Sequence, residues 1–275
     1  MIGIGASIAP GLQDVADDCV ATVRVMGVPR SGTNLVKYLI EHYLKRPVVF
    51  DRGFWKHGIF PALTSGRDMQ YGDLPIVVVS KDPVTQLLSW YREARNDTLF
   101  RSNGNLAAFL SKPFEVRQDF TRSGRMEYRF RSPSDYWNQF HFAMDALRRA
   151  GAPVHFVCYE HLVSAPALSL HLISHFLGHR YPFDVGSIVE IPPNKLAASN
   201  DVDRLASQQL DGALFDSTRA GLASALARIG WRNAKVILRD IDDDVLNATE
   251  RPGFRKICRQ AAGPQALVRS LIGFW

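Results

Sequence analysis

Residues 20–44 constrain the fold of this chain more than any other stretch, because they read in order as a strand, a short loop and a helix. The stretch begins with β-branched valines, which favour a buried strand. After the glycine-bounded loop at 27–33, apolar residues recur at the spacing of one helical face, as Leu35, Leu39 and Ile40. A loop in this position presents backbone N–H groups at a helix N-terminus, where the helix dipole also favours an anion. The sequence therefore predicts a phosphate-binding loop.

This loop differs from the P-loop of nucleotide triphosphatases after its second glycine. Gly27 and Gly32 have the G-x-x-x-x-G spacing, but that motif continues with Lys and then Ser or Thr, whose hydroxyl holds Mg²⁺. This chain has Thr33 and Asn34 there, and its cation, Arg30, lies inside the loop. We therefore expect a phosphate to be bound without a metal ion. An ordinary Gly/Pro turn between a strand and a helix is the alternative interpretation.

The letters PRSGT at 29–33 resemble the loop with which sulfotransferases bind 3′-phosphoadenosine 5′-phosphosulfate (PAPS). That donor has one phosphate at its 5′ end and needs no metal to bridge two of them. The resemblance implies that this loop neutralises charge on the leaving 5′-phosphate, with Arg30 acting in catalysis as well. The donor-binding residues that it implies here are Arg30, Ser31, Gly32, Thr33 and Asn34.

A second segment resembles the sulfotransferase signature for the 3′-phosphate. Residues 75–80, PIVVVS, are a continuous apolar run typical of a strand in a parallel sheet. Pro83 then marks the start of a helix predicted over 84–95. In the family, an arginine at the strand end and a serine eight residues later bind the 3′-phosphate. Lys81 and Ser89 have that separation, although lysine lacks the bidentate fork of arginine.

Two further residues receive roles from the same resemblance. Cytosolic sulfotransferases have a strand end reading Lys-Thr-His, and the segment WKHGIFP at 55–61 resembles it without the threonine. This resemblance implies that His57 removes the acceptor proton. Residues 153–159 predict another strand, and the YEHL that closes it resembles the family's YEDL, with His161 in place of aspartate. The family then places Tyr159 on the adenine. An ordinary half-buried histidine and a tyrosine that closes the core are the alternatives.

Residues 96–133 interleave basic and aromatic residues between glycine and proline breaks. We predict that they form an insertion that binds the acceptor, with one short helix at 106–111. A loop excursion whose aromatic residues pack back onto the core is the alternative. The next segment predicts a helix with Ser134 as its N-cap. Beyond residue 182 the chain reads as helical, and we assign it no role in the site.

Composition limits the kind of ligand and partner. Of the 275 residues, 46% are hydrophobic and 22% are charged, and the net charge of +6 favours an anionic ligand. Binding to nucleic acid would also explain the positive charge. The sequence has no basic helix, no zinc-ligand spacing and no aromatic RNP strand, so we expect no nucleic-acid partner. Three scattered cysteines are typical of reduced cytosolic proteins, which favours a cytoplasmic location. We also expect no transmembrane segment and no metal.

The order of strands and helices predicts an α/β fold with a central parallel sheet flanked by helices, of the P-loop nucleotide-binding, sulfotransferase-like kind. We predict one domain over residues 1–275. The resemblance, which spans about 20–180, implies a PAPS-dependent sulfotransferase that acts on a hydroxyl or amine of an unidentified acceptor. Saccharides and lipid-linked glycans are among the candidate acceptors. A P-loop kinase and a non-catalytic nucleotide-binding relative are the alternatives.

Overall fold

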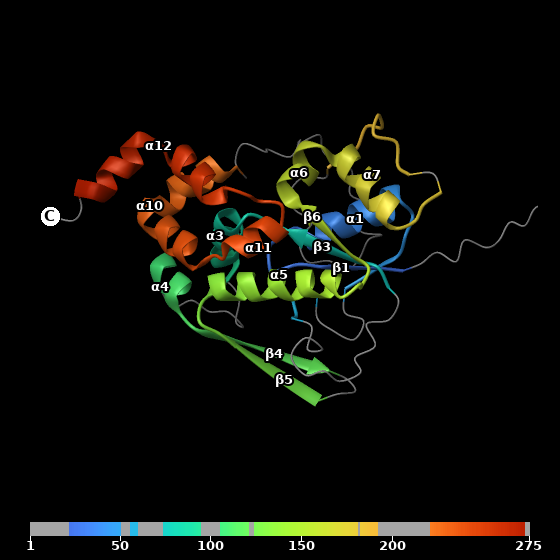
Figure 1. Ribbon diagram of the computed structural model, residues 1–275, viewed down its shortest axis with the longest axis horizontal. Helices are drawn as coiled ribbons and strands as arrows, with labels where there is room; N and C mark the ends of the chain where they lie inside the picture. Colours follow the sequence, from blue (N-terminus) through green and yellow to red (C-terminus); the bar gives the residue numbers. More distant parts are fainter. Residues whose placement is uncertain are drawn as a thin grey trace, which may run out of the picture.

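A four-stranded parallel sheet forms the centre of the protein (Figure 1). The computed structural model describes residues 22–50, 56–59, 74–94, 105–120, 124–180, 182–191 and 221–272. The sheet has the order β2-β1-β3-β6, and its strands are β1 Val23–Met26, β2 Val48–Val49, β3 Ile76–Ser80 and β6 Val154–Cys158. All three strand pairings are parallel. The predicted α/β fold with a central parallel sheet is therefore confirmed.

Helices cover both faces of this sheet, which is why the central strands read as continuous apolar runs. On β3, Val77 and Val79 face one apolar cluster, whereas Ile76 and Val78 face another. The first cluster is completed by helices α1 Thr33–Tyr43, α6 Tyr159–Ser164 and α7 Pro166–Phe176. The second is completed by α3 Pro83–Ala94, α5 Pro133–Arg149 and the C-terminal helices.

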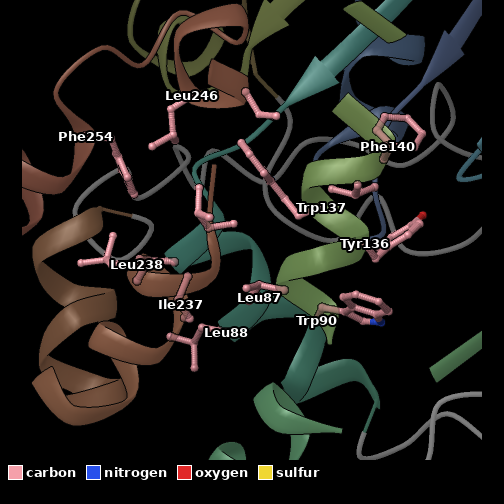
Figure 2. Packing of buried hydrophobic residues seen from close by; sticks show 14 of the residues in the cluster. Leu87, Leu88, Trp90, Tyr136, Trp137, Phe140, Ile237, Leu238, Leu246 and Phe254 are labelled. Atoms are coloured by element: carbon pink, nitrogen blue, oxygen red, sulfur yellow. The ribbon is translucent and has the colours of Figure 1, made fainter. Parts of the chain in front are cut away.

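The C-terminal helices form a large part of the second cluster. They are α10 Leu222–Asp240, which is broken at Gly230, α11 Asp243–Ala248, and α12 Phe254–Ile272, which is broken at Gly263. Figure 2 shows side chains from α10, α11 and α12 meeting those of α3 and α5. The labelled residues are Leu87, Leu88, Trp90, Tyr136, Trp137, Phe140, Ile237, Leu238, Leu246 and Phe254. The C-terminal segment is thus part of the same core as the sheet.

The described part of the predicted insertion contains a helix and an antiparallel hairpin. Helix α4 spans Leu106–Ser111 as predicted, and Phe109 and Leu110 enter the core. The hairpin consists of β4 Phe114–Phe120 and β5 Gly124–Phe130, and it extends beyond α5 in Figure 1. Residues 96–104 and 121–123 of the predicted insertion lie outside the described residues.

The prediction of Ser134 as the N-cap of α5 is wrong. The cap is Ser132, whose hydroxyl accepts a hydrogen bond from the backbone N–H of Asp135 at 3.1 Å. Pro133 then takes the first helical position, where its missing N–H costs no hydrogen bond. The Asp135 carboxylate in turn accepts from the backbone N–H of Arg131, which satisfies a further donor at the helix start.

In the ranges given above, no helix combines the length and the apolar character needed to cross a bilayer.

Candidate functional site

The predicted phosphate loop joins β1 to α1 at the carboxyl edge of the sheet. Met26 ends the strand, Thr33 begins the helix, and Gly32 is the N-cap with a φ of 102°. Because glycine has no side chain, no oxygen at the N-cap position competes with a ligand for the N–H groups of the first turn. Arg30, within the loop, also has a positive φ of 67° and an exposed side chain. The loop therefore has the build of an anion site at a helix N-terminus.

Ser31 is the most unusual side chain of this loop. It is fully buried, and its Oγ makes no hydrogen bond to any residue that the structure describes. A Cβ at Gly27 would lie only 2.3 Å from this Oγ and 2.7 Å from the carbonyl oxygen of Val79, so only glycine allows the loop to lie so close to β3. A buried hydroxyl without a partner costs free energy unless a ligand or water satisfies it.

The ends of β3 and β6 meet the loop at Gly32. A Cβ at Gly32 would lie 2.6 Å from the ring of Tyr159, which follows β6. The Nζ of Lys81, which follows β3, lies 4.6 Å from the centroid of the same ring. Burial lowers the pKa of Lys81, while Asp82 and Glu160 act in the opposite direction. The structure thus brings together three sequence-predicted residues that are far apart in the chain.

Replacing Gly32 with alanine is expected to destabilise the protein more than the same change at Gly151. Both glycines have positive φ values, of 102° and 90°, so each alanine costs about 1–2 kcal/mol of backbone strain. At Gly32 the new methyl group also meets the Tyr159 ring, whereas nothing lies within 4 Å of a Cβ at Gly151. Chemical denaturation of both variants measures the difference in unfolding free energy. Equal losses would mean that the Tyr159 ring does not lie against the loop.

The segment at 56–59 lies beside this loop and carries His57. The backbone N–H of Gly27 donates to the carbonyl oxygen of Lys56 at 3.1 Å, and His57 Nδ1 lies 2.5 Å from the carbonyl oxygen of Gly27. From the other side, the hydroxyl of Tyr136 on α5 donates to the carbonyl oxygen of His57 at 2.5 Å. His57 is therefore held between the end of β1 and α5.

The protonation of His57 follows from these contacts. A carbonyl oxygen only accepts hydrogen bonds, so Nδ1 carries the proton and Nε2 has the lone pair. The pKa of His57 is lowered to about 3, mainly by desolvation; the hydrogen bond to the Gly27 carbonyl opposes this shift, and the nearby charges of Lys56 and Arg30 add to it. The imidazole is thus neutral near pH 7, as a general base must be before it accepts a proton.

Lys56 is a residue to which sequence reasoning assigned no role. Its Nζ donates to Oδ1 of Asn34 in the first turn of α1 at 2.9 Å, and it lies 3.9 Å from the ring centroid of Phe50. The Asn34 side chain, predicted to bind the donor, therefore contacts a cation of the neighbouring segment. The feature of the sequence that could have indicated a role for Lys56 is its position directly before His57.

Helix α3 presents one face to the loop. The side-chain amide of Gln86 donates to the carbonyl oxygen of Pro29, and the carboxylate of Glu93 lies 3.9 Å from the Arg30 guanidinium. Ser89 is three residues after Gln86 and four before Glu93, so it lies on the same helical face. It is half-buried. Ser89 therefore faces the loop, as a ligand-binding hydroxyl would.

Positive charge gathers at this edge of the sheet. The charge of Arg30 lowers the pKa of both His57 and Lys81, and Lys56 lowers that of His57. These cations favour an anionic ligand, although Asp82 and Glu160 partly offset the charge at Lys81. Elsewhere, His179 accepts a hydrogen bond from Arg46 at 3.1 Å. Over the ranges that the structure covers, no group of three or more His, Cys, Asp or Glu side chains is placed to hold a metal ion.

The surroundings of Tyr159 bear on its predicted contact with adenine. The side chain is 8% exposed and belongs to the apolar cluster on the α1 face of the sheet. Burial raises the pKa of Tyr159 to about 12. This burial agrees with a tyrosine that closes the core, and the contact with adenine remains a prediction.

Comparisons with known proteins provide little beyond this geometry. No protein-family model and no curated protein matches the chain. Among solved structures, the chain is similar to mouse sulfotransferase SULT7A1 complexed with PAP, with 13% sequence identity and a TM-score of 0.37. The match covers 92% of this chain and 89% of that chain. A likeness at this identity and TM-score establishes no function, which has to follow from the residues of the site.

Proposed function

We propose that this protein is a sulfotransferase that uses PAPS to sulfate a hydroxyl or amine of an acceptor. The observation that carries the proposal is the meeting of a phosphate loop without the Walker lysine and a neutral histidine at one edge of the sheet. Gly27 joins them, since its N–H and its carbonyl oxygen both bind the segment that carries His57. An anion held by the loop would therefore lie near a base that can accept a proton.

The residues of the loop would bind the end of the donor from which the sulfuryl group leaves. The donor supplies an activated sulfuryl group on its 5′-phosphate, and the displaced product is adenosine 3′,5′-bisphosphate. Arg30 and the N–H groups of Ser31, Gly32 and Thr33 would stabilise the charge that builds on that phosphate. The unpartnered Oγ of Ser31 would gain an acceptor at the same time.

His57 would act on the acceptor rather than on the donor. As the acceptor oxygen or nitrogen forms its bond to sulfur, its proton would pass to Nε2 of His57, and the bond from sulfur to the 5′-phosphate oxygen would break. The bond from Nδ1 to Gly27 fixes the ring in the tautomer that can accept this proton. Lys81 and Ser89 would hold the 3′-phosphate, the charge coming from the end of β3 and the hydroxyl from α3.

We further propose that the acceptor binds near the hairpin of the predicted insertion. The hydroxyl of Tyr128 on β5 donates to the carbonyl oxygen of Ile59 at 3.2 Å, and Ile59 is two residues after His57. The hairpin thus lies close to His57, the candidate general base. A saccharide, a lipid-linked glycan, a small alcohol and an amine all have a group that this chemistry could sulfate.

The direct test is incubation with ³⁵S-labelled PAPS and a panel of these acceptors. We expect label to pass to at least one acceptor and adenosine 3′,5′-bisphosphate to be released. The Arg30→Ala variant serves as a control, because it should lose both donor binding and transfer. Tight binding of the nucleotide without transfer to any acceptor would instead favour a non-catalytic relative.

Binding of the donor is expected to survive removal of divalent metal. Thr33 and Asn34 stand where a Walker loop has the lysine and the Mg²⁺-binding hydroxyl, so no residue of the loop is suited to a metal-bridged triphosphate. Calorimetric titration with adenosine 3′,5′-bisphosphate should therefore give the same dissociation constant with EDTA and with Mg²⁺. If binding required Mg²⁺ and ATP bound more tightly than adenosine 3′,5′-bisphosphate, a P-loop kinase would replace the sulfotransferase as the proposed function.

A further inference from the structure

The side chain of Arg251 connects the ends of β3 and β6 to the C-terminal helices. Arg251 follows α11 and is 7% exposed. Its Nη1 donates to Oγ of Ser80 at 2.8 Å, and its Nη2 donates to the carbonyl oxygen of Ser80 at 2.9 Å. The same Nη2 forms an ion pair with Oε2 of Glu160 at 2.5 Å. One guanidinium thus binds two neighbouring strand ends.

These contacts lie next to two residues of the candidate site. Ser80 directly precedes Lys81, and Glu160 directly follows Tyr159. The second carboxylate oxygen of Glu160, Oε1, accepts from the backbone N–H of Asp82 at 2.9 Å, on the other side of Lys81. The backbone of Lys81 is therefore fixed on both sides through Arg251 and its partner.

The surrounding groups form a partly buried ionic cluster. The carboxylate of Asp82 accepts from the backbone N–H of Thr85, and the thiol of Cys158 donates to Glu160 at 3.2 Å. Arg251 and Lys81 both interact electrostatically with these two carboxylates. Because the Glu160 side chain is 40% exposed, solvent screens this ion pair, so a contribution to stability does not by itself explain the arrangement.

We propose that Arg251 is a positioning residue, which fixes the ends of β3 and β6 relative to each other and so holds Lys81 beside Tyr159 for the 3′-phosphate. This inference rests on the proposed function. It gives a role in the site to a residue of the C-terminal segment, to which the sequence assigned none. A displacement of about 1 Å in a positioning group can cost up to about a hundredfold in function, so a loss of this arrangement should be measurable.

The test is the ratio of the dissociation constants for 5′-AMP and adenosine 3′,5′-bisphosphate, measured by calorimetry. Both ligands are titrated into the same preparation, so any inactive fraction cancels in the ratio. We expect Arg251→Met to lower the ratio by about tenfold. Arg251→Lys keeps the charge but cannot bind Ser80 and Glu160 with one planar group, so we expect a smaller loss. If Arg251→Met does not fold, Arg251→Lys carries the test.

Arg255→Met is the matched control. Arg255 comes from the same C-terminal segment and binds Oδ1 of Asp243 at 2.8 Å and the carbonyl oxygens of Leu238 and Ile241. These partners belong to the α10–α11 region, so the variant should lose stability while the ratio stays at the wild-type value. If Arg251 had a purely structural role, Arg251→Met and Arg255→Met would both lower the melting temperature. Neither variant would then change the ratio of the two dissociation constants.

The measurement distinguishes an error in the 3′-phosphate assignment from an error in the positioning role of Arg251. If the wild-type protein binds both nucleotides equally well, the 3′-phosphate assignment is wrong and the role of Arg251 falls with it. If the wild-type protein prefers adenosine 3′,5′-bisphosphate to 5′-AMP and the Arg251 variants keep the same ratio of dissociation constants, only the positioning role is overturned. The proposed function then stands.

Discussion

Replacing His57 with alanine is expected to slow sulfuryl transfer by about 10²- to 10⁴-fold while the affinity for adenosine 3′,5′-bisphosphate stays near that of the wild type. The reason is that His57 would act on the acceptor proton, whereas the loop and Lys81 would bind the donor. Steady-state turnover with labelled PAPS, together with calorimetric titration of the product nucleotide, measures the two effects separately.

The matched control is His171→Ala. His171 lies on α7, on the opposite side of the sheet from α5, and its Nδ1 also lies close to a backbone carbonyl oxygen, that of Phe183 at 2.7 Å. We expect this variant to turn over like the wild type. Near-normal turnover of His57→Ala would show that another group takes the acceptor proton.

The pH dependence gives a second measurement of the same role. His57 is neutral above its folded pKa of about 3, so the form able to accept a proton is lost only as the pH falls through that value. An unperturbed histidine, with a pKa near 6.5, would lose it three to four pH units earlier. We therefore expect the rate attributable to His57 to be flat from pH 8 to about pH 4. A decline centred near pH 6.5 in the wild type would contradict the lowered pKa of the half-buried His57 imidazole.

Replacing Lys81 with alanine is expected to remove most of the preference for adenosine 3′,5′-bisphosphate over 5′-AMP. A hydrogen bond to a charged group contributes about 1.5–3 kcal/mol, which corresponds to roughly 10- to 150-fold in affinity. Lys81 is well placed for such a contact, because burial beside Tyr159 leaves its ammonium group poorly solvated. Calorimetric titration with both nucleotides measures the preference.

Two further lysine variants serve as controls. Lys81→Arg restores the residue found in the sulfotransferase signature and should keep the preference, since the charge remains and a bidentate fork is added. Lys37→Ala removes a cation of α1 that lies 3.6 Å from Glu41, and it should leave the preference unchanged. If the wild-type protein bound both nucleotides equally, Lys81 would have no role in selecting the donor.

Local sequence patterns were sufficient for the central sheet and its flanking helices, but not for the β4–β5 hairpin, which lies in a segment predicted to contain only one short helix. The valine-rich run at 75–80 predicts β3, and apolar residues at helical spacing predict α1, because such patterns depend on which faces of an element are buried. Their alternation then predicts a parallel sheet with helices on both faces. The loop between β1 and α1 follows equally, since glycine alone readily adopts the positive φ of Gly32 and allows the close approach at Gly27. The roles of the site residues remain proposals.

Other features are decided only by tertiary structure. The sequence does not reveal that Arg251 binds Ser80, because the two residues are 171 positions apart and no local periodicity relates them. The same holds for Lys56 with Asn34, and for the carbonyl of Gly27 that selects the tautomer of His57. Hydrogen-bond partners and pKa values depend on burial and on atoms from several elements at once. The chain's own pattern thus determines where the predicted phosphate loop lies, and the packing of its helices determines which charges surround it.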